Sequence, residues 1–175
     1  KDISGLLNYE TATITGKDGV KDTLKGGAGV DTITGGTGVD TMTGGAGADI
    51  FVFASTDAIA GTELDVITDF NAGGTADKLQ FAAAPTVLAA GGTAVAATSV
   101  TTTAGGKIGF AAADNTYALK VAAIQADTLL DVAKSIAFFE DSGNTYVYHA
   151  GAAIGNADDQ IIQLTGVTGL TTITA

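Results

Sequence analysis

The sequence predicts an all-β fold, in which a parallel β-roll continues into a β-rich, sandwich-like C-terminal part that contains one short helix. Three observations predict it. A nine-residue pattern recurs between residues 17 and 52, and a short fixed period is typical of solenoids built from stacked coils. The chain has 25 Gly but only 6% aromatic residues, which favours tight turns and thin sheets. Beyond the repeats, short apolar runs lie between turn residues, as expected of β-strands.

The repeats are marked by four aspartates that are nine residues apart: Asp22, Asp31, Asp40 and Asp49. Three consecutive rows, from Gly26 to Val52, read GGAGVDTIT, GGTGVDTMT and GGAGADIFV. They share the pattern G-G-x-G-x-D-x-U-x, where U is a large apolar residue. The row before them, residues 17–25, lacks the three glycines but keeps Asp22 and Leu24 in place.

Each row is expected to form a turn of six residues and a strand of three. Because side chains alternate across a strand, the residue U at the strand centre points inward. The residues expected in this thin core are Leu24, Ile33, Met42 and Phe51. The residues expected to face outward are Thr23, Thr32 and Thr41. Two rows complete one coil, so row 17–25 should stack on row 35–43, and row 26–34 on row 44–52.

The turns of these rows offer oxygen ligands for a metal ion. Glycine permits backbone angles that are closed to residues with a Cβ, so carbonyl oxygens can converge beside the carboxylate of each row. Ca²⁺ takes six to eight hard oxygen ligands, and each stacked pair of turns should hold one ion. The alternative is a metal-free solenoid whose aspartates cap turns, but it leaves stacked carboxylates without a counterion. The expected ligands are Asp18, Gly19, Asp22, Gly26, Ala28, Asp31, Gly35, Gly36, Thr37, Gly38, Asp40, Gly44, Gly45, Gly47, Asp49, Asp65 and Asp69.

Some of these candidates lie outside the motif. Asp18 is either a ligand that replaces a missing glycine carbonyl or a plain turn residue. One or both of Asp65 and Asp69, in the segment DVITDF, are expected to complete the last calcium turn opposite Asp40; otherwise they belong to a polar loop. Asp77 is a secondary candidate, as is Glu63.

Charge is concentrated in the same part of the chain. The net charge is −11, which argues against nucleic acid as a partner, because its binding needs basic patches. From Asp18 to Asp77, nine Asp and one Glu oppose two Lys, a local net charge of −8. There is no Cys, so disulfides cannot stabilise this Gly-rich segment. We expect Ca²⁺ to do so instead.

The remaining elements follow from local patterns. Strands are expected at 50–54, 76–81, 117–124 and 160–164. A β-hairpin is expected from 138–140 and 145–148, with its turn at 141–144. One helix is expected at 128–136, with Asp127 as its N-cap. Residues 82–113 are mostly Ala, Gly and Thr and fit either small strands or a loop.

The sequence predicts no catalytic site. The chain lacks the G-x-S-x-G and H-E-x-x-H motifs and has no Cys. His149 is the one histidine, and we expect it to be a surface or packed residue. Asp158 and Asp159 are expected in a solvated turn. A pair of catalytic carboxylates among the many aspartates stays open at this point.

Residues 16–81 resemble the C-terminal β-roll shared by RTX exoproteins and serralysin-type proteases, through the nonapeptides and the segments DIFVF, DVITDF and DKLQF. The rest is similar to the C-terminal region of Caulobacter-type surface-layer (S-layer) proteins, through GNTYV at 143–147 and IQLTGVTGL at 162–170. The resemblance implies calcium-dependent folding and export by a type I (ABC transporter) system that reads an uncleaved C-terminal signal. It also implies assembly with copies of itself at the cell surface, with outer-membrane polysaccharide as a further partner.

We therefore expect a lead-in strand at 1–15, a calcium-binding roll at 16–81, and a β cap with the secretion signal at 82–175. The start of the chain, without Met or signal peptide, suggests a fragment or a processed product. The predicted function is a non-catalytic, extracellular structural module that folds on binding Ca²⁺ after type I secretion and joins an S-layer. The alternative is the C-terminal folding domain of an exported protease or lipase, or of an RTX adhesin.

Overall fold

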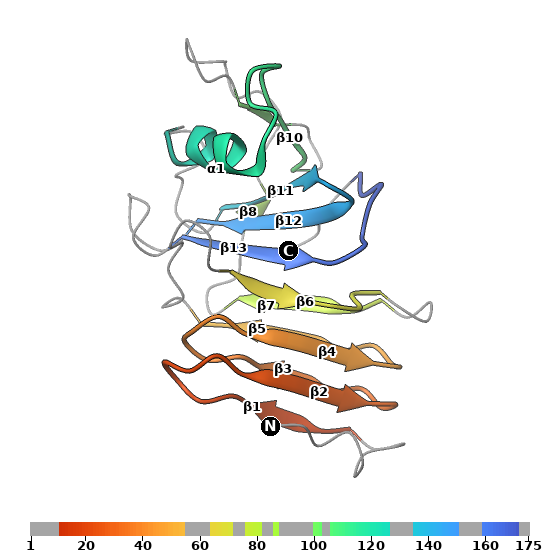
Figure 1. The fold of residues 1–175 in the computed structure, drawn as a ribbon. Coiled ribbons are helices and arrows are strands. Elements are labelled where there is room, and N and C mark those ends of the chain that lie inside the picture. Colours follow the sequence, from red (N-terminus) through yellow and green to blue (C-terminus); the bar gives the residue numbers. More distant parts are fainter. Residues whose placement is uncertain are drawn as a thin grey trace.

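The computed structural model describes residues 11–54, 64–71, 76–81, 86–87, 100–102, 106–126, 135–150 and 159–171. Within them the protein is strand-rich with one helix, and parallel strands stack from the N-terminal end toward the C-terminal part (Figure 1). The predicted fold class is thus confirmed. Among the described residues, no helix is both long enough and apolar enough to cross a membrane.

We call the first seven strands the roll and the later elements the cap. The roll contains β1 (Thr13–Thr15), β2 (Thr23–Gly27), β3 (Thr32–Thr34), β4 (Thr41–Gly45), β5 (Ile50–Phe53), β6 (Asp65–Ile67) and β7 (Lys78–Phe81). The cap contains β8 (Thr86–Val87), β9 (Thr101–Thr102), β10 (Ile108–Gly109), α1 (Tyr117–Ala126), β11 (Ser135–Asp141), β12 (Asn144–His149) and β13 (Gln160–Leu164).

The strands form two facing sheets and one small sheet. The long sheet has the order β2-β4-β6-β13-β12-β11-β8, the short sheet has the order β1-β3-β5-β7, and β10 pairs with β9. In the roll, Leu24 lies opposite Met42 and Ile33 lies opposite Phe51, both in parallel register. Rows two apart therefore stack, as the sequence predicts.

The roll extends beyond the nonapeptides at both ends. At its start, Ile14 of β1 lies opposite Ile33 in the short sheet, so the parallel ladder reaches into the segment expected as a lead-in strand. At its end, β6 pairs with β13 of the cap, with Val66 opposite Gln163. One continuous sheet thus joins roll and cap. The division at residues 15 and 81 stays a prediction.

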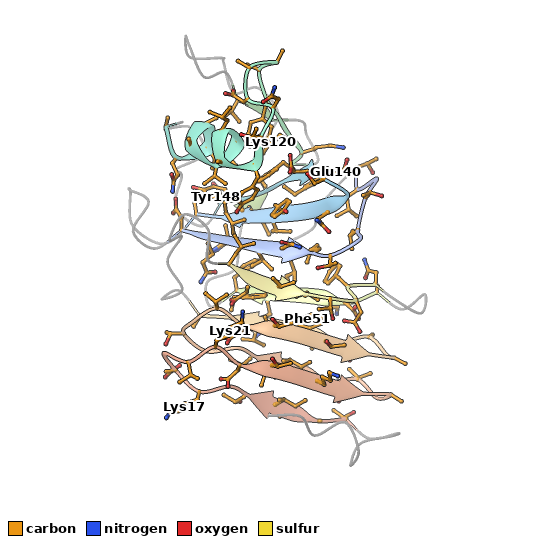
Figure 2. The ribbon with its side chains drawn as sticks, in the orientation of Figure 1. Lys17, Lys21, Phe51, Lys120, Glu140 and Tyr148 are labelled. Atoms are coloured by element: carbon orange, nitrogen blue, oxygen red, sulfur yellow. The ribbon has the colours of Figure 1, made fainter. Side chains whose placement is uncertain are left out.

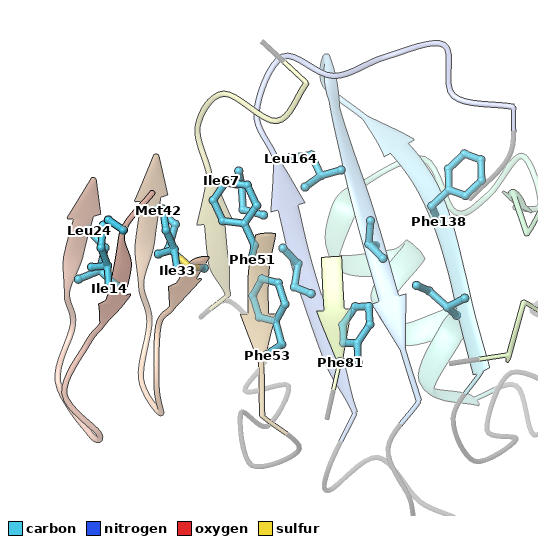
Figure 3. Packing of buried hydrophobic residues seen from close by; sticks show 14 residues of the cluster. Ile14, Leu24, Ile33, Met42, Phe51, Phe53, Ile67, Phe81, Phe138 and Leu164 are labelled. Carbon is cyan, nitrogen blue, oxygen red and sulfur yellow. The ribbon is translucent and has the colours of Figure 1, made fainter. Parts of the chain in front are cut away.

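One hydrophobic core lies between the two sheets and runs from the roll into the cap (Figure 3). Each nonapeptide strand contributes one large apolar residue to this core, and these four inward residues are fully buried: Leu24, Ile33, Met42 and Phe51. Toward the cap the core widens with aromatic rings, including a stacked pair, Phe53 and Phe81, whose centroids lie 5.7 Å apart. Burial of each such side chain stabilises the fold by about 1.5–3 kcal/mol relative to exposure.

A second core lies on the other face of the long sheet, within the cap. Val121 and Ile124 of α1 are buried there, together with Phe139 and Tyr146, whose rings stack at 5.1 Å. The strands β11 and β12 therefore bury both faces, whereas the roll strands leave one face to solvent. The two regions differ in how much apolar surface each strand buries.

The cap corrects part of the sequence interpretation. The strand expected at 117–124 is wrong: these residues form α1, because Thr116 caps the helix through Leu119 N–H (3.3 Å) and helix-forming Ala and Leu follow. The helix expected at 128–136 does not reach its end, because β11 begins at Ser135; residues 128–134 lie outside the described residues. The hairpin of β11 and β12 and the strands β5, β7 and β13 are confirmed.

Candidate metal centre

The aspartates of the roll form two columns, which we call the aspartate ladder. On the side of the long sheet the column is Asp22, Asp40 and Asp65; on the side of the short sheet it is Asp31, Asp49 and Asp77. In each column the backbone N–H of one aspartate donates to Oδ1 of the next at 2.8 Å. The ladder ties every coil to the coil stacked on it. It also brings carboxylates within one coil spacing of each other.

The ladder begins one row before the motif. Ala12 takes the aspartate position in a row that ends in β1, and its N–H donates to Oδ1 of Asp31 at 2.8 Å. This row offers the hydrogen-bond donor but no carboxylate. Asp40 and Asp49, the central aspartates of the two columns, are fully buried, and so is Asp31.

The aspartates of the ladder differ in whether their second carboxylate oxygen, Oδ2, has a hydrogen-bond partner. In Asp31 it accepts the N–H of Gly27 at 2.7 Å, and Asp22 and Asp77 have similar backbone donors. In Asp40 and Asp49 it is enclosed and has no hydrogen-bond partner among the described residues. A buried, unpartnered carboxylate oxygen is costly unless a cation neutralises it. These two oxygens are the positions at which a hard cation fits.

The electrostatics of the two central aspartates support the same conclusion. Burial raises the pKa of Asp40, and the charge of Asp22 adds to the effect against a backbone hydrogen bond that lowers it. Burial likewise raises the pKa of Asp49, with further contributions from the charges of Asp77, Asp31 and Asp69. Nearby carboxylates therefore disfavour ionisation here. A divalent cation would remove that penalty.

The glycines make room for these oxygens. A Cβ at Gly35 would lie 2.5 Å from Oδ2 of Asp40, and a Cβ at Gly44 would collide with Oδ2 of Asp49. Gly45 has a φ of 104°, and a Cβ there would collide with the carbonyl oxygen of Gly27 in the neighbouring coil. The first glycine of a row thus makes space for a carboxylate. The second lets a carbonyl oxygen approach.

The ligand set must consist largely of such carbonyl oxygens. Among the residues that the structure describes, no three acidic or histidine side chains converge on one point. Ca²⁺ accepts backbone carbonyls together with carboxylates, so a turn with one or two carboxylates suits it. The expected backbone ligands all lie in these turns and stay predictions as ligands: Gly19, Gly26, Ala28, Gly35, Gly36, Thr37, Gly38, Gly44, Gly45 and Gly47.

Two aspartates outside the ladder reach the same turns. Asp69 accepts the N–H groups of Gly44 and Gly45 at 2.9 and 2.8 Å, so both of its oxygens contact the turn that contains Asp49. Asp18 accepts the N–H of Thr37 at 3.2 Å, beside the turn that contains Asp40. Asp69 and Asp18 thus each form hydrogen bonds to the backbone of a neighbouring coil. That either residue binds the metal stays a prediction.

The expected closing residues divide between the columns. Asp65 lies next to Asp40 in the ladder, in the position that the sequence predicts. Asp69 instead lies over the turn of the other column, because it follows β6 and precedes β7. Glu63 lies outside the described residues.

Asp77 belongs to the ladder although the sequence interpretation gave it a secondary place. A signal was available: the segments ADIFVF at 48–53 and ADKLQF at 76–81 share the pattern A-D-x-U-x-F. The structure places them in register, with Phe51 opposite Leu79 and Phe53 opposite Phe81. The row is recognisable by its strand even though its turn has lost the nonapeptide spacing.

The other polar candidates lie away from the turns. His149 is only 3% exposed and stacks on Phe81 at 4.2 Å, so it is a packed residue, as expected. The prediction that Asp159 lies in a solvated turn is wrong. Asp159 is fully buried, and its Oδ2 accepts a hydrogen bond from the hydroxyl of Tyr148 at 2.7 Å. Its partner in the sequence, Asp158, lies outside the described residues.

Comparison with known protein families agrees with this geometry. Residues 14–51 match the RTX calcium-binding nonapeptide repeat, in four copies, and the match begins within β1. No curated protein is similar enough to the chain to count as a match. RTX nonapeptide repeats bind Ca²⁺ between turns of a β-roll and are characteristic of secreted proteins. The four rows from Ile14 to Phe51 are therefore RTX calcium-binding nonapeptide repeats, and Ca²⁺ is their metal.

Proposed function

We propose that this chain is a non-catalytic structural module that folds on binding Ca²⁺ outside the cell, after export by a type I (ABC transporter) system. The observation that carries the proposal is the pair of buried, unpartnered oxygens, Oδ2 of Asp40 and Oδ2 of Asp49. Each belongs to a carboxylate with ladder aspartates directly before and after it. Such a column tolerates its full ionisation only with cations between the coils.

The same feature supports a folding switch. Ordering a backbone costs about 1–2 kcal/mol per residue, and each nonapeptide strand buries one apolar side chain at its centre in return. Extracellular calcium modules have Kd values of roughly 10⁻⁴ to 10⁻³ M. At tenfold above Kd one site adds about 1.4 kcal/mol, and several sites add severalfold more. In calcium-poor cytosol the roll stays unfolded, which suits passage through a narrow conduit.

We further propose that the folded module joins a cell-surface S-layer lattice built from copies of the same protein. The support is the resemblance of two segments to Caulobacter-type S-layer proteins: GNTYV, which lies at the hairpin turn and in β12, and IQLTGVTGL, which lies in β13 and directly after it. The tail beyond them is the proposed secretion signal. An RTX tail of an exported enzyme or adhesin would share the calcium site and lack the lattice.

Electron microscopy of the purified chain tests the lattice. We expect ordered sheets at millimolar Ca²⁺ and their loss after chelation. Isolated particles under both conditions would remove the S-layer role and favour the enzyme-tail or adhesin alternative. Calcium binding is measured separately, so the two parts of the proposal fail independently.

A charge-matched pair of variants tests the calcium switch. Asp49→Asn keeps the acceptor for the N–H of Asp31 but removes one ladder charge, whereas Asp141→Asn removes one charge from the cap. We expect the calcium midpoint of folding, followed by far-UV circular dichroism, to rise about tenfold in Asp49→Asn. The control should change it less than about twofold. Equal midpoints in the two variants would contradict the assignment of the switch to the ladder.

A further inference from the structure

One dipeptide in the first turn of the roll combines two residues that can react with each other. Asp18 and Gly19 form the only Asp-Gly pair in the chain, and the sequence contains no Asn-Gly pair. Both residues are exposed and lie in a turn. Figure 2 shows the lysines on either side of the pair, Lys17 and Lys21, at the margin of the roll where the chain turns into β2. The pair is therefore a chemically distinct point of the roll.

The chemistry of the pair follows from its atoms. Because Gly19 has no side chain, its backbone nitrogen approaches the carboxyl carbon of Asp18 without obstruction. Attack of this nitrogen on Cγ forms a succinimide ring, and the amide proton leaves together with the carboxyl hydroxyl as one molecule of water. Water then adds to one of the two ring carbonyls. Addition at the side-chain carbonyl restores aspartate. Addition at the backbone carbonyl gives isoaspartate, whose main chain runs through Cβ and Cγ and is longer by one carbon.

In the folded roll Thr37 restrains both reacting groups. The N–H of Gly19 donates to the carbonyl oxygen and to Oγ1 of Thr37 at 2.6 and 2.7 Å. Oδ1 of Asp18 accepts the N–H of Thr37 at 3.2 Å. The nitrogen must lose its proton and turn toward Cγ in order to react, so these three hydrogen bonds oppose the reaction. Thr37 belongs to row 35–43, on which row 17–25 stacks, and the restraint exists only while the two rows are stacked.

We propose that Asp18–Gly19 is a site of spontaneous modification, at which aspartate converts to isoaspartate when row 17–25 separates from row 35–43. Isoaspartate displaces the carboxylate that contacts Thr37 and lengthens the turn, so the two rows cannot restore all three hydrogen bonds. A chain that has spent time without Ca²⁺ then folds less readily. The inference goes beyond the proposed calcium switch and rests on it only for the difference between the calcium-loaded and the calcium-free chain.

Peptide mapping with electron-transfer fragmentation distinguishes isoaspartate from aspartate and measures the modification at Asp18. The chain is aged at neutral pH with excess Ca²⁺, with a chelator, and in urea with a chelator, while circular dichroism records folding. A native chain reacts through its open fraction, and one calcium site at about tenfold above its Kd reduces that fraction about tenfold. We expect similar rates with chelator and in urea, and a rate at least about tenfold lower with Ca²⁺.

The three conditions separate failure of the site from failure of the switch. Absence of isoaspartate at Asp18 in urea would overturn the site. Equal rates with Ca²⁺ and with chelator, in a chain whose folding depends on Ca²⁺, would overturn the protection by Thr37. If strand signal does not depend on Ca²⁺, the switch fails; a lower rate in the folded chain than in urea then still supports the site, and equal rates overturn it.

The pair Asp141 and Ser142 serves as the internal control in urea. The side chain of Ser142 hinders the same attack by its backbone nitrogen, so this pair should accumulate less isoaspartate than Asp18. Equal accumulation at the two pairs would mean that Gly19 confers no particular reactivity and would overturn the assignment of the site.

Two variants test the restraint by Thr37. Thr37→Val removes the Oγ1 acceptor of the Gly19 N–H and keeps the backbone contacts, so in excess Ca²⁺ isoaspartate should form about fivefold faster. Thr34→Val makes the same change on β3, outside the turn, and should leave the rate unaltered. Circular dichroism verifies that both variants fold. Equal acceleration by the two variants, or none by Thr37→Val, would overturn the restraint.

The aged chain tests the consequence for folding. Chain that carries isoaspartate at position 18, separated by chromatography from unmodified chain, should need about threefold more Ca²⁺ for half-maximal strand signal. An unchanged calcium midpoint would overturn the proposed effect on folding.

Discussion

The roll and the cap are built on one continuous sheet, yet they are stabilised in different ways. A nonapeptide strand buries one apolar residue, such as Ile33, between two outward threonines. A cap strand such as β11 buries Phe138 on one face and Phe139 on the other. The cap therefore obtains its stability from aromatic packing on two faces. The roll has half as many buried faces and fills its turns with carboxylates, which supports the proposal that it depends on a cation to fold.

The pKa values of acidic residues also differ between the roll and the cap. In the roll, burial and neighbouring carboxylates raise the pKa of Asp40 and of Asp49. In the cap, the hydrogen bond from Lys120 is the main cause that lowers the pKa of Asp141. Burial works to raise the pKa of Glu140, but Lys107 and the backbone at Gly169 outweigh it and lower the pKa. At these two residues the cap neutralises carboxylates with its own lysines, whereas in the roll we expect Ca²⁺ to do so.

Removal of calcium should have the largest effect on hydrogen-exchange protection, and the effect should differ between the roll and the cap. We expect chelation to expose the amides of β2 to β5 to fast hydrogen exchange, while amides of β11 and β12 retain most of their protection. The reason is that only the roll loses counterions for its buried carboxylates. Hydrogen exchange read by mass spectrometry separates these segments. Equal loss of protection in both would contradict the division.

Truncation of a core ring in the cap should be the next largest effect. Phe138→Ala removes a fully buried side chain and should reduce the free energy of unfolding by about 3–5 kcal/mol. Because the ring lies in the cap, the calcium midpoint of roll folding should change much less than the stability to urea at saturating Ca²⁺. Urea denaturation and calcium titration of the same variant measure the two. A shift confined to the calcium midpoint would be unexpected.

Matched glycine substitutions compare the backbone of the two regions. Gly45→Ala forces a Cβ into the carbonyl oxygen of Gly27 at a φ of 104° and should cost about 3 kcal/mol. Gly166→Ala, after β13, has a φ of 72° but open space around its Cβ and should cost about 1 kcal/mol. Thermal unfolding of both variants in excess Ca²⁺ gives the comparison. Similar costs would mean that the coils of the roll are less tightly stacked.

The dependence on pH should have opposite signs in the two regions. The pKa values of Asp40 and Asp49 are raised above 3.8 on folding, so the folded, calcium-free roll binds more protons than the unfolded chain. Its stability is then greatest below that value and falls as pH rises through the raised pKa. Glu140 and Asp141 have lowered pKa values, and their stabilisation of the cap is lost as pH falls.

Circular dichroism of the calcium-free chain checks this sign. Strand signal of the roll should increase on acidification from about pH 7 to about pH 4. With Ca²⁺ present the trend should reverse, because protons compete with the ion for the same carboxylates. A calcium-free roll that loses strand signal on acidification would contradict the assignment of the raised pKa values.

The roll was predictable because each of its structural requirements leaves a mark at a fixed spacing. Gly44 and Gly45 must lack a Cβ, Asp49 must occupy the turn, and Phe51 must point inward; a nine-residue period records all of these. Prediction was incomplete where the spacing breaks. Asp77 belongs to the ladder, but its turn has a different length from the nonapeptide turn, so only its strand pattern identifies it.

The cap was less predictable because its strands bury both faces. In such strands apolar residues do not alternate, and a short apolar run fits a helix or a strand equally well. The segment from Tyr117 is helical because Thr116 caps it and because Val121 and Ile124, three residues apart, pack on the sheet. The hairpin was found because Ser142 and Gly143 mark its turn, and both have positive φ.

The two central carboxylates of the ladder are the most direct place to test the dependence of the roll on calcium. Crystals grown in saturating Ca²⁺ allow anomalous diffraction to locate the ions. We predict density beside Oδ2 of Asp40 and beside Oδ2 of Asp49, the oxygens that lack a hydrogen-bond partner among the described residues. Well-ordered coils with no ion beside either oxygen would contradict the account.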